Sequence, residues 1–448
     1  EKLIKKFDAK QKLRKTFYPL LEKGFNSNDI LKGIEVLLSR NITMSSITKE
    51  FENEFAKFIG SKYALMVNSG SSANLLSSFA LINPKKKNHL KKGDKFIIPA
   101  TCWSTSLWPL IQCGLKAEFI DVNINNYCLD ESLLKKKNIK NIKAILDIHI
   151  LGNSSNIKEI SSVAKKNNIF LIEDTCEALG SRFGSKYLGT FGDFGTYSFY
   201  YSHQITSGEG GMIVCKTKED YNLIHTMRSH GWDRGLRPEE KNKKFNFVNS
   251  GFNLRPLDIT AAIALSQLKR LKKMMAIRAR NRNLIVEEIK KSNRWNNQFD
   301  FFNSNENVKP SWFGFPLLIN KLYLKNKQNF IKYLNISNIE TRPIISGNFL
   351  NQPGAKLYKL DRNPKRFKIS QEIEDIRRVG IGSEDERMRI FSQKFAVMVV
   401  LLGLLGPLPA ALAQDSSPSQ PKVSAQEKKL TLGQLIARGG LTMFPLGM

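Results

Sequence analysis

The order of apolar and amphipathic segments is the feature that most restricts how this chain can fold. From residue 62 onward, short apolar runs alternate with segments of helical periodicity, as in KYALMVN, SSANLLSSFALI, KFIIPA, KAEFIDV, IKAILDIHI, IKEISSVAKKNN and IFLIEDT. Strands separated by single helices are typical of a largely parallel sheet with helices on both faces. Ligands bind such α/β sheets beyond the carboxyl ends of the strands, so the residues that follow each strand are candidates for a functional site.

Length and composition predict two packed domains, because the chain has 448 residues and 41% of them are hydrophobic. We predict a large domain over residues 1–250, which includes the N-terminal helices, and a smaller α+β domain over residues 251–376. The smaller domain would contain the segments SWFGFPLLI and NIETRPIIS. Asp258 is predicted to cap the helix that begins there.

The last part of the chain, residues 377–448, differs in composition from the rest. Residues 388–413 have a basic start, an apolar run over 395–413 and an Ala-x-Ala pattern before Gln414, which is the layout of a secretory signal peptide. The alternative is a C-terminal membrane anchor, which Pro407 and Pro409 disfavour. We interpret this tail as a fusion or a gene-prediction artefact, and we expect an enzyme truncated after about residue 376 to remain active.

The chain is strongly basic, with 70 Lys and Arg residues against 40 Asp and Glu residues and a net charge of +30. The lysines stand in scattered clusters at residues 84–87, 90–95 and 134–138, and no basic stripe is interleaved with aromatic residues. We therefore expect no nucleic-acid partner. A positive surface attracts anionic small substrates such as a nucleotide-sugar diphosphate.

The cysteines favour a reducing compartment and no bound metal. Their number is odd, their spacing is wide and no CxxC or CxC pair occurs, which disfavours a disulfide framework, a zinc site and an iron–sulfur cluster. The pattern fits a cytoplasmic enzyme. The five residues are Cys102, Cys113, Cys128, Cys176 and Cys215.

Several residues that follow predicted strands are suited to binding a phosphorylated ring. The turn NSGSSANL (68–75) opens a helix and could bind a phosphate through backbone N–H groups, although it could also be an ordinary capped turn. Asp174, at the end of IFLIED, could hold a protonated ring nitrogen. The alternative is that Asp174 and Glu177 cap a helix. Trp103 could stack on a flat ring or lie in the core, and His149 and Asn153 are interpreted as structural.

Taken together, these stretches resemble a known family. NSGSSANL, LIEDTCEALGSRFGSKYLGTFGDFGTYSF, GEGG and GFNLRPLDITAAIALSQL are similar to the sugar aminotransferases of the DegT/DnrJ/EryC1/StrS family, over about residues 35–376. The resemblance implies a fold-type I α/β transferase with a helix-covered, largely parallel central sheet, in which the large domain binds pyridoxal or pyridoxamine phosphate. By the same resemblance, the enzyme acts on a nucleotide sugar in deoxysugar, lipopolysaccharide and O-antigen biosynthesis.

His203 is the departure from that family that bears on the reaction. The family segment normally reads S-F-x-x-x-K, and its lysine binds the cofactor as a Schiff base, but the fifth residue after Ser198 is His203. Imidazole can transfer a proton near neutral pH but cannot form that linkage. A freely dissociable pyridoxamine phosphate and a dehydration would then replace amino transfer.

Within the family, the sequence looks closest to the metal-free 3-dehydratases of GDP-4-keto-6-deoxymannose, which regenerate pyridoxamine from L-glutamate. The alternatives are an iron–sulfur-dependent CDP-4-keto-6-deoxyglucose 3-dehydrase, a pyridoxal-phosphate-dependent sugar aminotransferase, and a catalytically silent binding or regulatory homologue. The absence of a close cysteine pair disfavours the iron–sulfur type.

The resemblance also implies a role for individual residues. His203 would be catalytic, and the weaker candidates for substrate binding are His230, Arg255 and Arg342. Asn253 would reach the phosphate of the neighbouring subunit, which implies a homodimer with shared active sites. The other implied cofactor contacts are Gly70, Ser71 and Ser198 at the phosphate, Trp103 stacked on the ring, Asp174 at the ring nitrogen and Glu177 near the ring.

Overall fold

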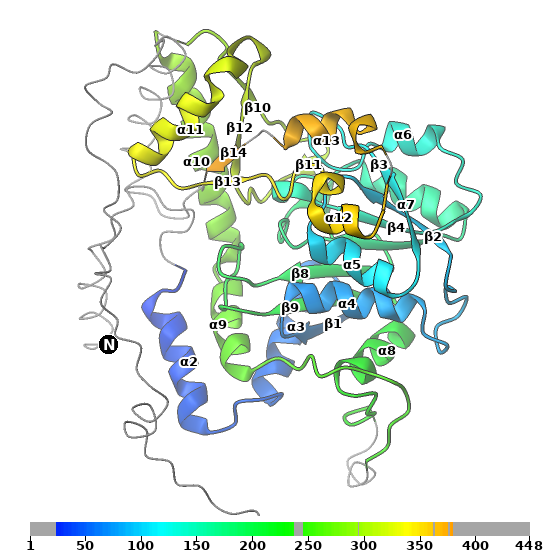
Figure 1. The fold of residues 1–448 in the computed structure, drawn as a ribbon. Coiled ribbons are helices and arrows are strands. Elements are labelled where there is room, and N and C mark those ends of the chain that lie inside the picture. Colours follow the sequence, from blue (N-terminus) through cyan, green and yellow to red (C-terminus); the bar gives the residue numbers. More distant parts are fainter. Residues whose placement is uncertain (1–23, 237–244, 294, 362, 375–376, 380–448) are drawn as a thin grey trace, which may run out of the picture. The chain divides into compact units, whose positions relative to one another are not determined.

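The computed structural model describes residues 24–236, 245–293, 295–361, 363–374 and 377–379, all of which belong to one compact unit of the chain. Its centre is a seven-stranded sheet in the order β1-β9-β8-β5-β4-β2-β3 (Figure 1). The strands are β1 (Tyr63–Val67), β2 (Lys95–Pro99), β3 (Lys116–Ile120), β4 (Ile142–Ile148), β5 (Phe170–Asp174), β8 (Phe194–Ser198) and β9 (Gly211–Cys215).

Most of this sheet is parallel, as the sequence predicts. The pairs β3/β2, β2/β4, β4/β5 and β5/β8 are parallel, whereas β9 runs antiparallel to both β8 and β1. Ser198 at the end of β8 lies opposite Gly211 at the start of β9. The intervening connection, residues 199–210, therefore leaves and re-enters the sheet at the carboxyl edge of β8, and it carries His203.

Helices cover both faces of the sheet, which confirms the predicted fold class. Along β1, Leu65 and Val67 face a core shared with α4, α5 and α8, while Ala64 and Met66 face a core shared with α3 and α9. This alternation is the two-residue period of a strand buried on both sides. The helices are α2 (Ser27–Ser39), α3 (Ser46–Ile59), α4 (Gly70–Leu81), α5 (Ser104–Gln112), α6 (Glu131–Lys136), α7 (Ile157–Lys166), α8 (Lys218–Arg228), α9 (Asp258–Leu268), α10 (Leu271–Lys291), α11 (Lys327–Ile336), α12 (Pro353–Leu357) and α13 (Lys368–Ile373).

Two smaller antiparallel sheets complete the strands of the described residues. One has the order β10-β12-β14-β13 and the other the order β11-β6-β7. The second sheet pairs β6 with β11, and so joins segments from the two predicted domains; the boundary at residue 250 stays a prediction. Their strands are β6 (Arg182–Phe183), β7 (Lys186–Tyr187), β10 (Phe299–Phe301), β11 (Val308–Lys309), β12 (Phe315–Ile319), β13 (Thr341–Pro343) and β14 (Arg377–Val379).

The predicted role of Asp258 as a helix cap is wrong for its own helix. Asp258 is already the first residue of α9, and its carboxylate accepts hydrogen bonds from the backbone N–H groups of Ser45 and Thr48 at 2.9 and 3.1 Å. It therefore satisfies N–H groups at the start of α3, 210 residues away in the sequence. A local pattern cannot show which helix end a carboxylate will meet.

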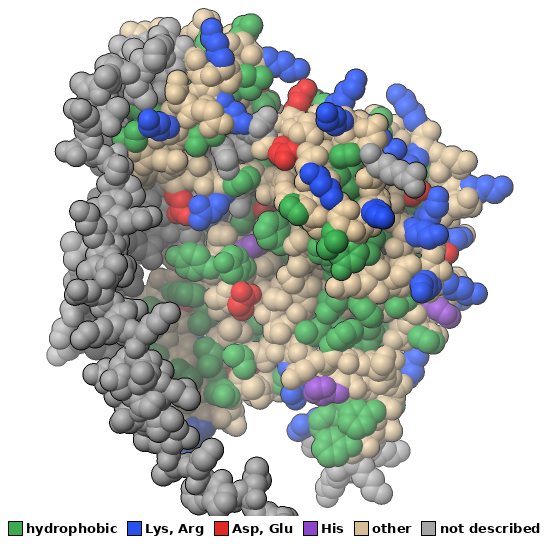
Figure 2. All heavy atoms as spheres, in the orientation of Figure 1, with side chains coloured by type: hydrophobic (Ala, Val, Ile, Leu, Met, Phe, Trp, Pro, Cys, Tyr) green, Lys and Arg blue, Asp and Glu red, His purple; other side chains and the backbone are tan. Residues whose placement is uncertain are grey.

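Two further predictions concern the C-terminal tail and the basic surface of the protein. Residues 388–413, with the signal-peptide-like segment, lie outside the described residues, and none of the described helices is long and apolar enough to cross a membrane. On the face shown in Figure 2, the Lys and Arg side chains of the described residues stand in separate groups and form no continuous stripe. The expectation that the protein has no nucleic-acid partner stays a prediction.

Candidate active site

A cavity of about 990 Å³ opens at the carboxyl edge of the central sheet. The segments that follow β1, β2, β5 and β8 line it, together with Phe313 and residues 340–345 from the C-terminal part of the chain. The predicted site residues that line it are Gly70, Ser71, Trp103, Asp174, Glu177, Ser198, His203 and Arg342. The structure thus brings together eight residues that are spread over more than 270 positions in the sequence.

One end of the cavity is formed by the N-terminus of α4. Ser69 caps this helix by accepting a hydrogen bond from the Ser72 N–H at 3.1 Å, so the capped-turn interpretation is correct for Ser69. A Cβ atom on Gly70 would lie 2.6 Å from the Cβ of Ser198, so only glycine permits this approach of helix and strand. The result is a concave surface of N–H and hydroxyl groups at the positive end of a helix, which suits a phosphate.

Asp174 lies at the end of β5 and points into the cavity as a nearly buried carboxylate. Its Oδ2 accepts hydrogen bonds from Asn74 Nδ2 at 2.8 Å and from Ser106 Oγ at 2.7 Å, and its Oδ1 accepts one from the Cys176 N–H at 3.2 Å. Thr196 donates to Asn74 Oδ1 at 2.6 Å, which fixes the orientation of the Asn74 amide. These bonds hold the carboxylate in one direction, as a partner for a protonated ring nitrogen requires.

The alternative in which Asp174 and Glu177 cap a helix is wrong, because the described chain from 174 to 179 forms turns and no helix begins there. Glu177 instead accepts a hydrogen bond from the Leu151 N–H at 2.9 Å. Trp103 is not a core residue either. It precedes the first residue of α5, and 55% of its surface is exposed at the cavity, where a ring could stack on it.

His203 is half-buried in the connection between β8 and β9 and lines the cavity. Its backbone N–H donates to the Tyr200 carbonyl at 2.9 Å, which closes a turn. Its imidazole packs on the ring of Phe313, with 5.0 Å between the ring centroids and 53° between the planes. The imidazole is thereby placed in the cavity that also contains Asp174 and the N-terminus of α4.

Arg342 comes to the cavity from β13, in the second sheet. Its Nη2 atom forms an ion pair with Glu340 Oε1 at 2.7 Å, and Glu340 also lines the cavity. Arg342 is the one Lys or Arg side chain among the described residues of the lining. Since more than half of its side chain is exposed, this guanidinium can reach an anionic ligand.

The remaining predicted residues, Asn253, Arg255 and His230, do not line this cavity. They lie near one another: Ser229 and Asn253 form an isolated β-bridge, and Arg255 Nε donates to Asn253 Oδ1 at 3.0 Å. All three are exposed. The Asn68 N–H donates to the Leu254 carbonyl at 3.2 Å, which puts this exposed segment beside the turn that precedes α4.

The sequence interpretation did not include several residues of the lining. Asn74 was detectable, because it lies four positions after Gly70 and therefore on the same face of α4. Ser106, three positions after Trp103 in the first turns of α5, carries a similar signal. Phe313 and Glu340 had no local signal, since they come from segments that fold back from the C-terminal part of the chain.

His149 has the structural role that was predicted for it. It is fully buried, and its Nε2 lies 3.1 Å from Glu173 Oε2. Burial opposes the charged imidazole, but the bond to Glu173 and the nearby negative charges, including Asp147, outweigh burial and raise the pKa of His149. Asn153 is also buried and donates to the Asn303 carbonyl at 3.0 Å.

No group of three or more His, Cys, Asp or Glu residues among those described could hold a metal ion. The five cysteines are all described and free, and only Cys176 is less than fully buried. Burial, and secondarily the charge of Asp174, raises the pKa of the Cys176 thiol well above its usual range. This side chain is therefore a neutral thiol rather than a thiolate nucleophile or ligand.

Comparisons with known proteins agree with this geometry. The sequence profile of the DegT/DnrJ/EryC1/StrS aminotransferase family matches residues 26–376. GDP-4-keto-6-deoxy-D-mannose 3-dehydratase of Escherichia coli O55:H7 is 39% identical over 351 residues, which cover 76% of this chain and 89% of that protein.

Two solved structures are similar over the same region. A variant of GDP-4-keto-6-deoxymannose-3-dehydratase with bound GDP-perosamine has a TM-score of 0.78 and 35% identity, and the match covers 86% of this chain and 100% of that one. The same type of enzyme with a trapped PLP–glutamate geminal diamine has a TM-score of 0.76 and 34% identity, with 85% and 99% covered.

Proposed function

The chain belongs to the DegT/DnrJ/EryC1/StrS aminotransferase family, and we propose that it is a pyridoxamine-phosphate-dependent nucleotide-sugar 3-dehydratase. It removes the C3 hydroxyl of a 4-keto-6-deoxyhexose of the GDP-4-keto-6-deoxymannose type, in the synthesis of a dideoxysugar for surface polysaccharide. One observation carries the proposal: His203 lines the cavity, and no lysine is among the described residues of the lining.

The cavity fits the cofactor that this reaction requires. Gly70, Ser71 and Ser198 would hold its phosphate at the N-terminus of α4, where the lack of a side chain on residue 70 lets Ser198 lie close to the helix. Trp103 would stack on the ring, Asp174 would pair with the ring nitrogen, and Glu177 would lie near the ring. When bound, the cofactor supplies an amine that condenses with the substrate ketone and a ring that accepts electrons.

His203 supplies the proton transfer in this proposal. Imidazole exchanges a proton near neutral pH, and Phe313 restricts the orientation of its ring in the cavity. Because imidazole cannot form a covalent link of the lysine type, the cofactor stays dissociable and no side chain is available to release an amino sugar. The β-hydroxyl therefore leaves, and the amine does not remain on the sugar.

The overall reaction balances with L-glutamate as the second substrate. The nucleotide ketosugar and glutamate give the 3-deoxy ketosugar, 2-oxoglutarate and ammonia, and the water that leaves the sugar equals the water that is taken up. Support for glutamate comes from the similar enzyme with the PLP–glutamate adduct. Arg342 is the candidate for binding an anionic group of either substrate, in exchange for its ion pair with Glu340.

We also propose a homodimer in which Asn253 completes the phosphate site of the partner subunit, with His230 and Arg255 beside it. Asn253 is exposed and lies outside the cavity of its own chain, as this role requires. A His203→Asn subunit and an Asn253→Ala subunit, each inactive alone, would regain about a quarter of the native activity when mixed one to one, since half of the dimers would have one intact site. If Asn253 acts within its own subunit, the mixture stays inactive.

Product analysis tests the reaction. Incubation with GDP-4-keto-6-deoxymannose, pyridoxamine phosphate and glutamate should give a 3-deoxy ketosugar, ammonia and 2-oxoglutarate, as measured by mass spectrometry and enzymatic assay. A 4-amino sugar would contradict the proposal and favour an aminotransferase. Iron and sulfide in anaerobically purified protein would favour the iron–sulfur dehydrase, and a complete lack of turnover would favour a binding or regulatory homologue.

A further inference from the structure

Gln204, the residue that follows His203, has an unusual set of bonds for a side chain next to an active-site loop. It is 1% exposed, and both hydrogens of its amide nitrogen are engaged. Nε2 donates to the carbonyl of Glu177 at 2.6 Å and to Ser311 Oγ at 3.1 Å. The Glu177 carbonyl can only accept a hydrogen bond, so the nitrogen of the amide must face it rather than the oxygen. This contact determines the orientation of the amide.

These bonds connect three segments that line the cavity. Glu177 is itself a lining residue, and Ser311 stands two positions before Phe313, whose ring packs on the His203 imidazole. The backbone next to His203, the backbone of Glu177 and the segment that carries Phe313 are therefore all connected to one buried amide. A displacement of Gln204 would move His203 and Phe313 relative to each other.

The bond network continues into a rigid part of the fold. Ser311 Oγ lies 2.9 Å from Ser181 Oγ, and Ser181 Oγ lies 2.6 Å from the Gly152 carbonyl. With each hydroxyl donating onward, from Gln204 through Ser311 and Ser181 to Gly152, every one of these bonds is satisfied. Ser181 and Ser311 are fully buried, so the network is shielded from water.

A second glutamine holds the same loop from the other side. Gln267, on α9, accepts from the Thr206 N–H at 3.0 Å and donates to the Thr206 carbonyl at 2.7 Å. Between these two attachments Ile205 is buried in the core that α3 and α9 share. Gln267 thus fixes the backbone of the loop at Thr206, whereas Gln204 connects the loop to Glu177 and Ser311, which belong to segments that face the imidazole.

We propose that Gln204 is a positioning residue for His203, which fixes the imidazole against Phe313 in the direction of the transferred proton. This inference rests on the proposed function, because it assigns His203 the proton transfer. Gln204 contacts neither the reacting atoms nor the cofactor in this role. It acts through the backbone that it shares with His203 and through Ser311.

The first test uses the imidazole itself as the readout, in protein without cofactor. The chain has five histidines, so nitrogen-15 labelling and a His203→Asn variant identify the His203 signal. Gln204→Leu should move the titration midpoint of His203 by more than about half a pH unit and change its tautomer balance. Gln267→Leu, the matched control, should leave the His203 signal in place. An unchanged signal in Gln204→Leu, or equal shifts in both variants, would overturn the proposal.

The second test uses activity and a pH profile. Gln204→Leu should lower kcat by about 100-fold with little change in KM, because a displaced general base costs that much, while Gln267→Leu at equal thermal stability should retain most of kcat. In Gln204→Glu, only the neutral carboxyl can donate to the Glu177 carbonyl. Activity should therefore be present at low pH and lost as pH rises, whereas a pH profile identical to that of the native enzyme would contradict the inference.

The two tests separate failure of the inference from failure of the proposed function. If the native enzyme does not dehydrate the nucleotide sugar but the His203 signal still moves in Gln204→Leu, the positioning role stands and the proposed function fails. If the native enzyme is a dehydratase and the His203 signal does not move, the function stands and the positioning role fails.

Discussion

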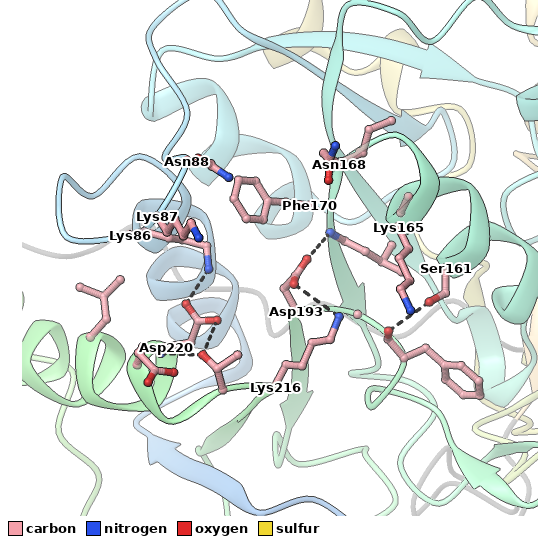
Figure 3. A pocket seen from close by; sticks show the side chains of 18 of the residues that line it. Lys86, Lys87, Asn88, Ser161, Lys165, Asn168, Phe170, Asp193, Lys216 and Asp220 are labelled. Carbon is pink, nitrogen blue, oxygen red and sulfur yellow. Dashed lines mark hydrogen bonds and ion pairs between the residues drawn. The ribbon is translucent and has the colours of Figure 1, made fainter.

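The central sheet has a cavity at each edge, and the two differ in how their polar groups are used. The cavity at the carboxyl edge contains His203 and Asp174, held by neutral hydrogen-bond donors and by packing. The second, of about 540 Å³, lies at the amino edge, where β5 begins and β9 ends (Figure 3). The charged side chains that line it are Lys85, Lys86, Lys87, Lys165, Lys216, Asp193, Glu219 and Asp220.

In the pocket at the amino edge, charged side chains of the lining form ion pairs with one another. Lys86 Nζ lies 2.5 Å from Asp220 Oδ1, and both side chains are less than a tenth exposed. The same ammonium lies 4.9 Å from the ring centroid of Phe170, and Lys216 pairs with Asp193 at 3.8 Å. In Figure 3 these partners point toward one another rather than into the open space.

The difference indicates two uses of polar side chains. Neutral partners can orient a side chain that still binds a ligand, whereas two opposite charges in direct contact neutralise each other and serve the fold. Among the described residues, the groups that donate to Asp174 are the Asn74 amide, the Ser106 hydroxyl and the Cys176 N–H, all of which are uncharged. Lys86 is opposed by a full negative charge at contact distance. Mutations should therefore change catalysis in one region and stability in the other.

The largest expected effect is at His203. His203→Asn should lower kcat by about 10²–10⁴-fold, the usual contribution of a general acid–base group, without a change in the unfolding temperature. His203→Lys should lose dehydration and bind pyridoxal phosphate covalently, as seen in its absorption spectrum. Lys165→Ala, in the other pocket, is the matched control and should retain native kcat. If the native protein were inactive and only His203→Lys bound the cofactor covalently, the dehydratase proposal would fail.

The next effect should appear only in stability. Asp220→Ala leaves the buried Lys86 ammonium without its counter-charge, which should reduce the free energy of unfolding by about 3–5 kcal/mol. Chemical denaturation measures this loss, and kcat at a permissive temperature should be unchanged. The double variant Lys86→Met, Asp220→Leu removes both charges and should recover most of the stability. A fall in kcat in the folded Asp220→Ala enzyme would show that the two regions are coupled.

Several residues of the carboxyl-edge cavity could be predicted from the sequence, whereas the ion pairs of the amino-edge pocket could not. Gly70, Trp103, Asp174 and His203 each follow a strand, and a parallel sheet brings such positions to one edge. The direction of β9 could not be predicted, since a 12-residue connection permits either a crossover or a return beside the same strand.

Partners that are distant in the sequence account for the other errors and omissions. Asp258 caps a helix 210 residues away, and Asp174 orients on Asn74, 100 residues away, rather than on a helix of its own. Lys86 lies in the lysine cluster at residues 84–87, and its buried partner Asp220 is 134 residues away in the sequence. Local patterns predict elements and their ends, whereas the partner of a buried charge depends on the assembled fold.

A moderate effect is expected at Asp174, where the comparison can be sharpened. Asp174→Asn keeps the shape but removes the charge that would face the ring nitrogen, so the affinity for pyridoxamine phosphate should fall by about 10–100-fold, the value of a charged hydrogen bond. Equilibrium dialysis or fluorescence titration measures this. Asp193→Asn at the other edge is the control and should leave cofactor affinity unchanged. Equal affinities in native and Asp174→Asn protein would remove Asp174 from the cofactor site.

The smallest expected effect concerns the pH dependence of stability. His225, in the last turn of α8, is partly buried, and burial, with Arg228 and Lys218 nearby, lowers its pKa to about 3. Because the folded pKa lies below the unfolded value, the unfolded chain binds more protons between these values. Stability from neutral His225 is thus present above about pH 6.5 and is lost as pH falls toward 3.

His225→Gln should therefore flatten the acid side of the stability curve measured by thermal unfolding, and it should leave the pH dependence of kcat unchanged. Under the proposed function, the activity profile depends instead on His203, which lines the cavity at the other edge. If His225→Gln shifted the activity profile, proton binding at α8 would be coupled to the active site, and the assignment of the two edges to separate roles would be wrong. An unchanged stability curve would show that His225 is accessible to protons in the folded state.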